Sequence, residues 1–145
     1  MNNTAKMATL ETLLGSIPSI RCLEGCSDCC GPVDMSALEW RRIIQRTGRT
    51  NLKAEMMKAT MKALDGNPVD CPLLDTASNK CSVYDIRPTI CRAFGASLAK
   101  TPHGSMICPH GVTAEHPMSK ERTDFLLHKA TELGGRSPQL VKLFR

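Results

Sequence analysis

The chain has 145 residues, eight cysteines, a formal net charge of +5 and only 3% aromatic residues. This length fits a single domain, residues 1–145, whose core is thin because large apolar residues are few. The first residues do not form a signal peptide, and no apolar run approaches the roughly 18 residues of a membrane-spanning helix. We therefore expect a cytoplasmic protein without membrane contact, whose thiols stay reduced.

The first predicted element is a short amphipathic helix over residues 4–15, which ends at Gly15 before the Ile17–Pro18 step. A loop follows that carries four cysteines within nine residues, at Cys22, Cys26, Cys29 and Cys30. Thiolates held this close repel one another and oxidise easily unless a cation holds them. The loop, called here the cysteine knot, therefore indicates a metal site.

Two helices are predicted between Cys30 and Cys71. Ser36 and Glu39 form a capping box, which predicts a helix that runs to about Thr47. Asn51 is expected to cap the next helix, which ends near Gly66. We expect the pair to form an antiparallel hairpin that returns the chain to the cysteine knot.

From residue 67 to residue 111 the chain is rich in proline and carries the other four cysteines, Cys71, Cys81, Cys91 and Cys108. Short extended pieces are predicted at 82–84 and 105–107, with a turn at 78–80. Pro88 suits the first turn of a short helix that would carry Cys91. We expect this segment to be irregular and to need a ligand at its centre.

Two further helices are predicted near the C-terminus, one after Ser119 and a short one over 138–144. The fold class is therefore mainly α, a small single domain of helices wrapped around an irregular metal-binding region. That region spans residues 22–110, and the C-terminal helices span 119–145.

The eight cysteines are the leading ligand candidates. They are Cys22, Cys26, Cys29, Cys30, Cys71, Cys81, Cys91 and Cys108. Cys26 and Cys29 can present two sulfurs to one metal, as zinc knuckles do. The dispersed later cysteines and the two Cys-Pro steps favour an iron–sulfur cluster, of the 4Fe-4S kind, over zinc by a narrow margin. The number of sites and the grouping of the sulfurs stay open.

Other polar residues near the cysteines allow two interpretations. His103 and His110 could supply nitrogen ligands, but a surface position is more typical of histidines in polar loops. Arg87 and Arg92 flank Cys91 and could donate hydrogen bonds to thiolate sulfur, or pair with Asp85 or Asp75.

The string from Cys81 to Phe94, C-x-x-Y-x-x-R-P-x-x-C-R-x-F, together with the cysteine knot, resembles the YkgJ-type cysteine-cluster family. The resemblance spans about Cys22 to Cys108 and implies a zinc- or iron-chelating domain with a CxxCxxCC motif. This chain has three residues, not two, between Cys22 and Cys26. A related cysteine cluster in flagellin lysine methylases keeps an enzymatic interpretation open.

Three function classes therefore compete. The first is a metal-binding protein that acts in binding, electron transfer or regulation. The second is a small iron–sulfur enzyme of methyl transfer or redox chemistry; the Cys22, Cys26 and Cys29 spacing matches radical-SAM enzymes, but no β/α barrel follows. The third is a nucleic-acid-binding protein, which rests on a basic strip. The strip contains Arg41, Arg42, Arg46, Arg49 and Lys53, and a solvated helix face is the favoured interpretation of it.

Overall fold

The computed structural model describes residues 2–23, 25–33, 35–101 and 104–135. Within these ranges the helices are α1 (Asn3–Gly15), α2 (Ala37–Thr47), α3 (Leu52–Leu64), α4 (Thr89–Ala93) and α5 (Lys120–Gly134), with a 3-10 turn η1 (Tyr84–Ile86). The strands are β1 (Leu74–Asp75), β2 (Lys80–Cys81), β3 (Lys100–Thr101) and β4 (Gly104–Ser105). The prediction of a small, mainly helical domain is confirmed. The helix expected at 138–144 lies outside the described residues.

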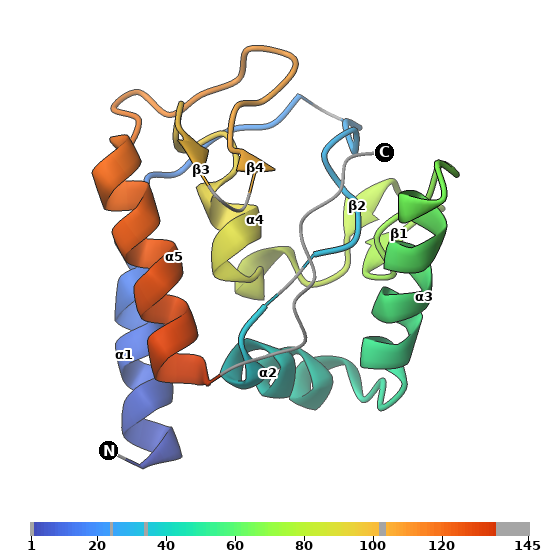
Figure 1. The fold of residues 1–145 in the computed structure, drawn as a ribbon, viewed down its shortest axis with the longest axis horizontal. Coiled ribbons are helices and arrows are strands. Elements are labelled where there is room, and N and C mark those ends of the chain that lie inside the picture. The colour runs from blue at the N-terminus through green and yellow to red at the C-terminus, as the bar shows by residue number, and fades with distance from the viewer. Residues whose placement is uncertain (1, 24, 34, 102–103, 136–145) are drawn as a thin grey trace.

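Helices α1 and α5 lie side by side and antiparallel along one edge of the molecule (Figure 1). Each begins at a side-chain cap: Asn2 accepts a hydrogen bond from Ala5 N at 2.8 Å, and Ser119 accepts one from Arg122 N at 3.1 Å. The pair buries a shared apolar face made of Leu10, Leu14, Leu126, Leu127 and Ala130. None of the described helices has the length and apolar character needed to cross a membrane.

Helix α2 has the predicted capping box. Glu39 N donates to Ser36 Oγ at 3.3 Å, and Ser36 N donates to Glu39 Oε1 at 3.0 Å. The other carboxylate oxygen of Glu39 accepts from Thr89 N at 2.6 Å and from Thr89 Oγ1 at 2.9 Å. This buried carboxylate therefore ties the start of α2 to the start of α4, the helix that carries Cys91.

The expected antiparallel hairpin of α2 and α3 is wrong. Figure 1 shows α2 lying across the base of the molecule while α3 stands upright at the opposite edge from α1. The connection explains the difference, because Gly48 ends α2 in the left-handed conformation and Arg49 donates to the carbonyl of Pro72 at 2.8 Å. Arg49 also pairs with Glu55, so the turn is held to the cysteine-bearing segment. Asn51 starts α3 without a side-chain cap hydrogen bond.

Two small antiparallel hairpins replace the extended pieces predicted at 82–84 and 105–107. In the first, Leu74 pairs with Cys81, and in the second, Lys100 pairs with Ser105. The turn between β1 and β2 covers residues 76–79, so the predicted turn at 78–80 is present but its last residue, Lys80, already belongs to β2. Residues 82–84 run into η1 instead of extending a strand. Asp75 supports the turn between β1 and β2, because its carboxylate accepts hydrogen bonds from Ala77 N and Ser78 Oγ.

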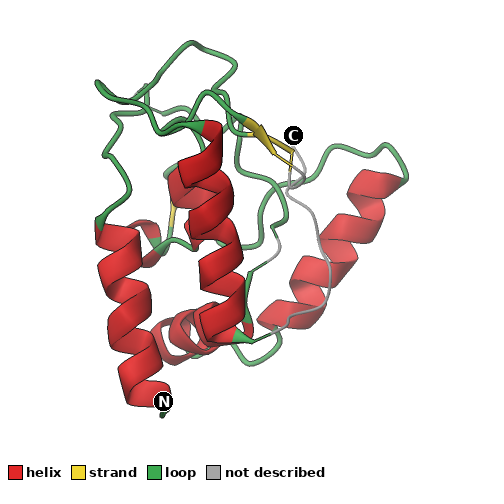
Figure 2. Ribbon diagram, turned by 60° about the vertical axis from the view of Figure 1, so that its left-hand side comes forward, coloured by secondary structure: helices red, strands yellow, loops and turns green. Residues whose placement is uncertain are grey.

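The core lies between α1, α2, α4 and α5 and includes the fully buried Trp40, Ile43, Leu126 and Met106. Figure 2 shows that the loops gather at the end of the molecule far from the N-terminus, with helices at the sides and the base. The helices therefore act as a frame for the irregular, cysteine-bearing loops.

Candidate metal centre

Seven cysteines line one cavity of about 460 Å³. They are Cys22, Cys26, Cys29, Cys30, Cys71, Cys81 and Cys91. Cys22 is exposed and the other six are partly buried. Four of these residues come from the cysteine knot and three from the segment 71–91, so two stretches separated by α2 and α3 meet at this cavity.

The backbone of the cysteine knot forms two consecutive tight turns, which end at Cys26 and Cys30. Cys26 N donates to Leu23 O at 3.1 Å, and Cys30 N donates to Ser27 O at 2.9 Å. Cys71 N donates to Cys30 O at 3.2 Å, which joins the knot to the later segment. These turns explain how residues so close in sequence can face different parts of the site.

Asn79 fastens the β1–β2 hairpin to the cysteine knot. Its side chain accepts a hydrogen bond from Ser27 Oγ at 2.7 Å and donates one to Gly25 O. Asn79 has a φ of 58°, a left-handed conformation that asparagine tolerates better than most residues. The hairpin thereby holds Cys81 against the loop that carries Cys26.

Cys108 lies in a second, much smaller pocket of about 20 Å³. Cys22, Cys26 and Cys29 line both pockets, whereas Cys30 lines only the large one. The adjacent Cys29 and Cys30 therefore differ in the pockets that they line. Sequence alone did not indicate that Cys108 would stand apart from the other seven.

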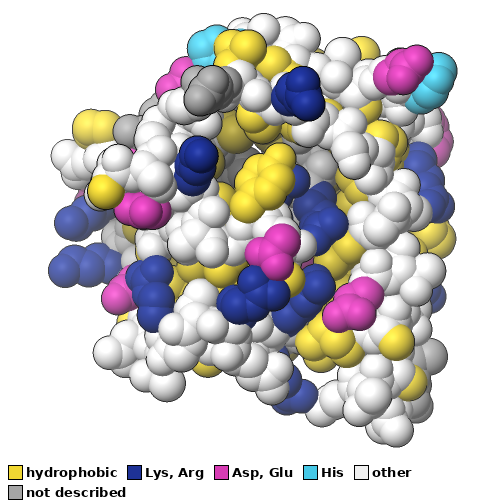
Figure 3. Space-filling model, turned by 180° about the vertical axis from the view of Figure 1, so that it is seen from behind, with side chains coloured by type: hydrophobic (Ala, Val, Ile, Leu, Met, Phe, Trp, Pro, Cys, Tyr) yellow, Lys and Arg dark blue, Asp and Glu magenta, His cyan; other side chains and the backbone are white. Residues whose placement is uncertain are grey.

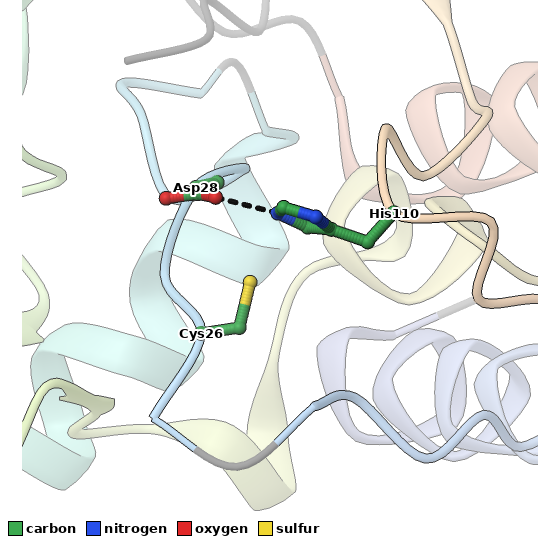
Figure 4. A group of neighbouring side chains, drawn as sticks. All are labelled: Cys26, Asp28 and His110. Atoms are coloured by element: carbon green, nitrogen blue, oxygen red, sulfur yellow. Dashed lines mark hydrogen bonds and ion pairs between the residues drawn. The ribbon is translucent and has the colours of Figure 1, made fainter.

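The small pocket also brings Cys26 and His110, both considered as ligands from the sequence, together with Asp28, which was not. One ligand atom each from Cys26, Asp28 and His110 lies within 4.8 Å of the other two (Figure 4). His110 Nε2 is 2.5 Å from Asp28 Oδ2. The favoured interpretation of His110 as a plain surface residue missed this contact. The available signal was its position two residues after Cys108.

Comparison with known proteins matches residues 21–124 to the sequence profile of the CxxCxxCC family, described as "putative zinc- or iron-chelating domain". The chain belongs to this family. The match covers most of the chain and confirms the resemblance that its cysteine pattern carries. No curated protein and no solved structure matched the chain.

The thiols of this CxxCxxCC domain influence one another electrostatically. The pKa of Cys22 is raised, first by partial desolvation of its thiol and then by negative charge on Cys29, with smaller contributions from Cys108 and Cys26. The guanidinium of Arg87 acts in the opposite direction. Several thiolates near one another are costly without a cation, which agrees with the metal-chelating character of the family.

The two arginines beside Cys91 have different partners from those expected. Arg92 donates to the backbone carbonyls of Arg87 and Asp85, and its pKa is lowered by burial and by the charge of Arg87. Arg87 lines the large cavity, and its guanidinium lies 3.9 Å from the centre of the Tyr84 ring. The carboxylate of Asp85 instead pairs with Arg46 at 2.9 Å.

The basic strip is largely occupied by contacts within the domain. Arg42 pairs with Glu11 at 3.5 Å, Arg46 pairs with Asp85, and Arg49 pairs with Glu55. The face in Figure 3 likewise intersperses acidic side chains among the basic ones. These pairs favour the interpretation of the strip as a solvated surface. His103, the other histidine considered, lies outside the described residues.

Proposed function

We propose that this CxxCxxCC domain holds a 4Fe-4S cluster in its large cavity and acts as a small cluster-binding protein in electron transfer or regulation. The observation that carries the proposal is the convergence of seven cysteines on one cavity of about 460 Å³. Cysteine thiolates are the usual ligands of such clusters, and four are needed. When bound, a cluster of this kind accepts and donates single electrons.

The size of the cavity favours a cluster over a single zinc ion. Zinc–sulfur bonds of about 2.3 Å put the four sulfurs of a tetrahedral site only about 3.8 Å apart. Among the described residues, the one group of three metal-ligating side chains whose ligand atoms lie within 4.8 Å of one another includes a single cysteine, Cys26. The other thiols surround a wider space, which suits a larger inorganic core.

We assign the cluster to Cys30, Cys71, Cys81 and Cys91. These four line the large cavity but not the small pocket. The backbone hydrogen bond from Cys71 to Cys30 and the pairing of Leu74 with Cys81 hold three of them in one local framework. Glu39 ties the helix of Cys91 to the core through Thr89. These contacts would position the four ligands relative to one another and to the helical core.

The rest of the cavity wall suits a cluster with a net negative charge. Leu23, Val33, Leu73 and Val83 contribute apolar surface, which limits access of water. Arg87 lines the same cavity and contributes a positive charge near the sulfurs. Burial, solvent access and nearby charge are the properties through which proteins set the potential of such clusters.

The test is metal and acid-labile sulfide analysis, with a visible absorption spectrum, on the full chain purified without oxygen. We expect about four iron and four sulfide per chain in the wild type. Cys91→Ser should lose the iron and the sulfide, whereas Cys108→Ser should keep both, because Cys108 lies only in the small pocket.

Two results would contradict the proposal. A colourless protein without iron would contradict the cluster, and zinc that is lost in Cys91→Ser would then make the large cavity a zinc site. Equal loss of iron from Cys91→Ser and Cys108→Ser would contradict the assignment of ligands, since the two variants remove the same chemical group from different pockets.

A further inference from the structure

The small pocket offers a set of donor atoms unlike that of the large cavity. It combines a sulfur from Cys26, a carboxylate oxygen from Asp28 and a ring nitrogen from His110, all within 4.8 Å of one another. We propose that these three side chains bind a single divalent transition-metal ion such as zinc. This site lies beside the large cavity, and the proposal does not depend on what that cavity holds.

The three donor types match the preferences of zinc. Zinc binds cysteine sulfur at about 2.3 Å, histidine nitrogen at about 2.0–2.1 Å and carboxylate oxygen at about 2.0–2.2 Å. Tetrahedral geometry at these bond lengths separates the donors by roughly 3.3–3.8 Å. Small side-chain rotations would therefore bring the trio from its present separation to bonding positions. An iron–sulfur cluster would prefer a set of thiolates over this mixed one.

The space in the pocket also fits one ion. Its volume of about 20 Å³ compares with about 460 Å³ for the large cavity. A volume just above roughly 10–15 Å³ accommodates one particle the size of a water molecule. Three protein ligands leave a fourth position of a tetrahedral ion for solvent. The side chains of His110 and Asp28 are 39% and 61% exposed, so the ion would exchange with the surrounding solution.

The fold presents the three ligands from two separate loops. In Figure 4, Cys26 and Asp28 lie on one loop and His110 on another, with the Cys26 sulfur directed toward the Asp28–His110 pair. Asn79 holds the first loop through hydrogen bonds at residues on either side of Cys26, namely Gly25 and Ser27.

A turn fixes the second loop, where Gly111 N donates to Cys108 O at 3.1 Å and Gly111 has a φ of 74°. Contacts that involve none of the three ligands therefore hold the first loop and shape the turn of the second.

The site removes Cys26 from the ligands available to the large cavity. Six cysteines still line that cavity, including the four assigned to the cluster. Cys22 and Cys29 line both pockets and form the wall between them. The two sites would thus be neighbours that share a wall but no ligand.

The experiment compares the exchangeable zinc of four proteins as isolated: wild type, His110→Gln, Asp28→Ala and the control His128→Gln. Each is dialysed to equilibrium against buffered zinc, and zinc, iron and sulfide per chain are measured. His128 is a matched control because its side chain is 81% exposed on α5 and contacts only Glu132 among the described ion pairs. We expect His110→Gln and Asp28→Ala to bind about one zinc fewer than wild type and His128→Gln.

Iron and sulfide should be the same in all four proteins. Equal zinc in His110→Gln and wild type would overturn the site, because the His110–Asp28 contact would then be an ordinary surface ion pair. Loss of iron and sulfide together with zinc in His110→Gln would overturn its independence from the large cavity. If no protein contains iron, the cluster proposal fails, but the difference of one zinc between variants still tests this site.

Discussion

The helical frame, formed by α1, α2 and α5, and the cysteine loops, residues 22–33 and 71–91, are stabilised in different ways. In the frame, Leu10, Trp40 and Leu126 are at most 1% exposed, and side-chain caps begin all three helices. In the cysteine loops, single hydrogen bonds such as those of Asn79 join short turns around a cavity. Apolar burial holds the frame throughout. The loops add scattered core side chains such as Val33, Leu73 and Val83, and otherwise depend on polar contacts and on what their thiols bind.

We infer from this contrast that the frame provides most of the folding stability, whereas the cysteine loops provide the metal ligands. We expect the frame to pack without a metal because its buried contacts are mainly between apolar side chains. The cysteine loops place several mutually repelling thiolates around one space, so they gain most from a bound cation. The difference leads to four expected outcomes, beginning with the largest.

Removal of the metal should loosen the cysteine loops far more than the frame. Structural metals can contribute on the order of 10 kcal/mol to folding, and here that contribution acts on the loops. After anaerobic treatment with a strong chelator, hydrogen exchange measured by mass spectrometry should show lost protection in residues 71–91. Protection in α1 and α5 should persist longer, and equal loss in both regions would contradict the division.

Glu39→Ala should break the link between the frame and Cys91. The buried carboxylate accepts hydrogen bonds from Ser36 N, Thr89 N and Thr89 Oγ1, so its removal should cost about 2–4 kcal/mol. Urea unfolding measures this cost, and metal analysis measures the effect on the site. Glu121→Ala, in the exposed first turn of α5, is the matched control and should change stability by less than about 0.5 kcal/mol.

Gly95→Ala should destabilise the connection between α4 and the β3–β4 hairpin, where Gly95 N donates to Met106 O. Gly95 has a φ of 80°, and an added Cβ would lie 2.6 Å from Cδ1 of Ile20. The conformation costs roughly 1–2 kcal/mol for a residue with a side chain, and the close contact adds to it. Gly66→Ala is the control, because Gly66 has a φ of 84° and an added Cβ there would lie in open space. It therefore measures the cost of the backbone conformation alone. Equal losses of stability in the two variants would show that Ile20 moves aside freely.

Arg46→Gln should have the smallest effect, confined to Asp85. The pKa of Asp85 is lowered mainly by its hydrogen bond from Arg46, so the pair stabilises the fold above the ordinary aspartate pKa. That contribution disappears as the pH falls through the lowered pKa. NMR titration should show the pKa of Asp85 rising in Arg46→Gln. The pKa of Asp75, lowered by Ser78, should stay unchanged, and a matching rise there would contradict a local effect.

The parts of the fold that sequence predicted well are those set by neighbouring residues. The Ser36–Glu39 capping box and the cap at Ser119 depend on contacts within one turn, and the short helix after Pro88 follows from the fixed φ of proline. All three are present. The arrangement of α2 and α3 was wrong because it depends on the hydrogen bond from Arg49 to Pro72, 23 residues away. Local patterns carry no information about such a contact.

In the candidate site, too, sequence predicted the features that depend on local pattern and missed those that depend on residues distant in the chain. The cysteine pattern indicated metal chelation and the family, which the profile match confirms. It could not separate Cys108 from the other cysteines, because that separation arises only when the two loops meet. The contact between Asp28 and His110 joins residues 82 positions apart, and neither residue alone has a distinctive spacing. Which cysteines bind which metal stays a prediction.

The two groups of cysteines at the large cavity also become available at different times. Cys30 and Cys91 lie on opposite sides of α2 and α3 in the chain. At about 5–20 residues per second, the ribosome completes Cys91 several seconds after Cys30. Until Cys71 and Cys81 are made within that interval, the cysteine knot has none of its later partners, and α2 and α3 are synthesised first. The metal centre of a nascent chain is therefore completed late, and its first four thiols need a reducing environment until then.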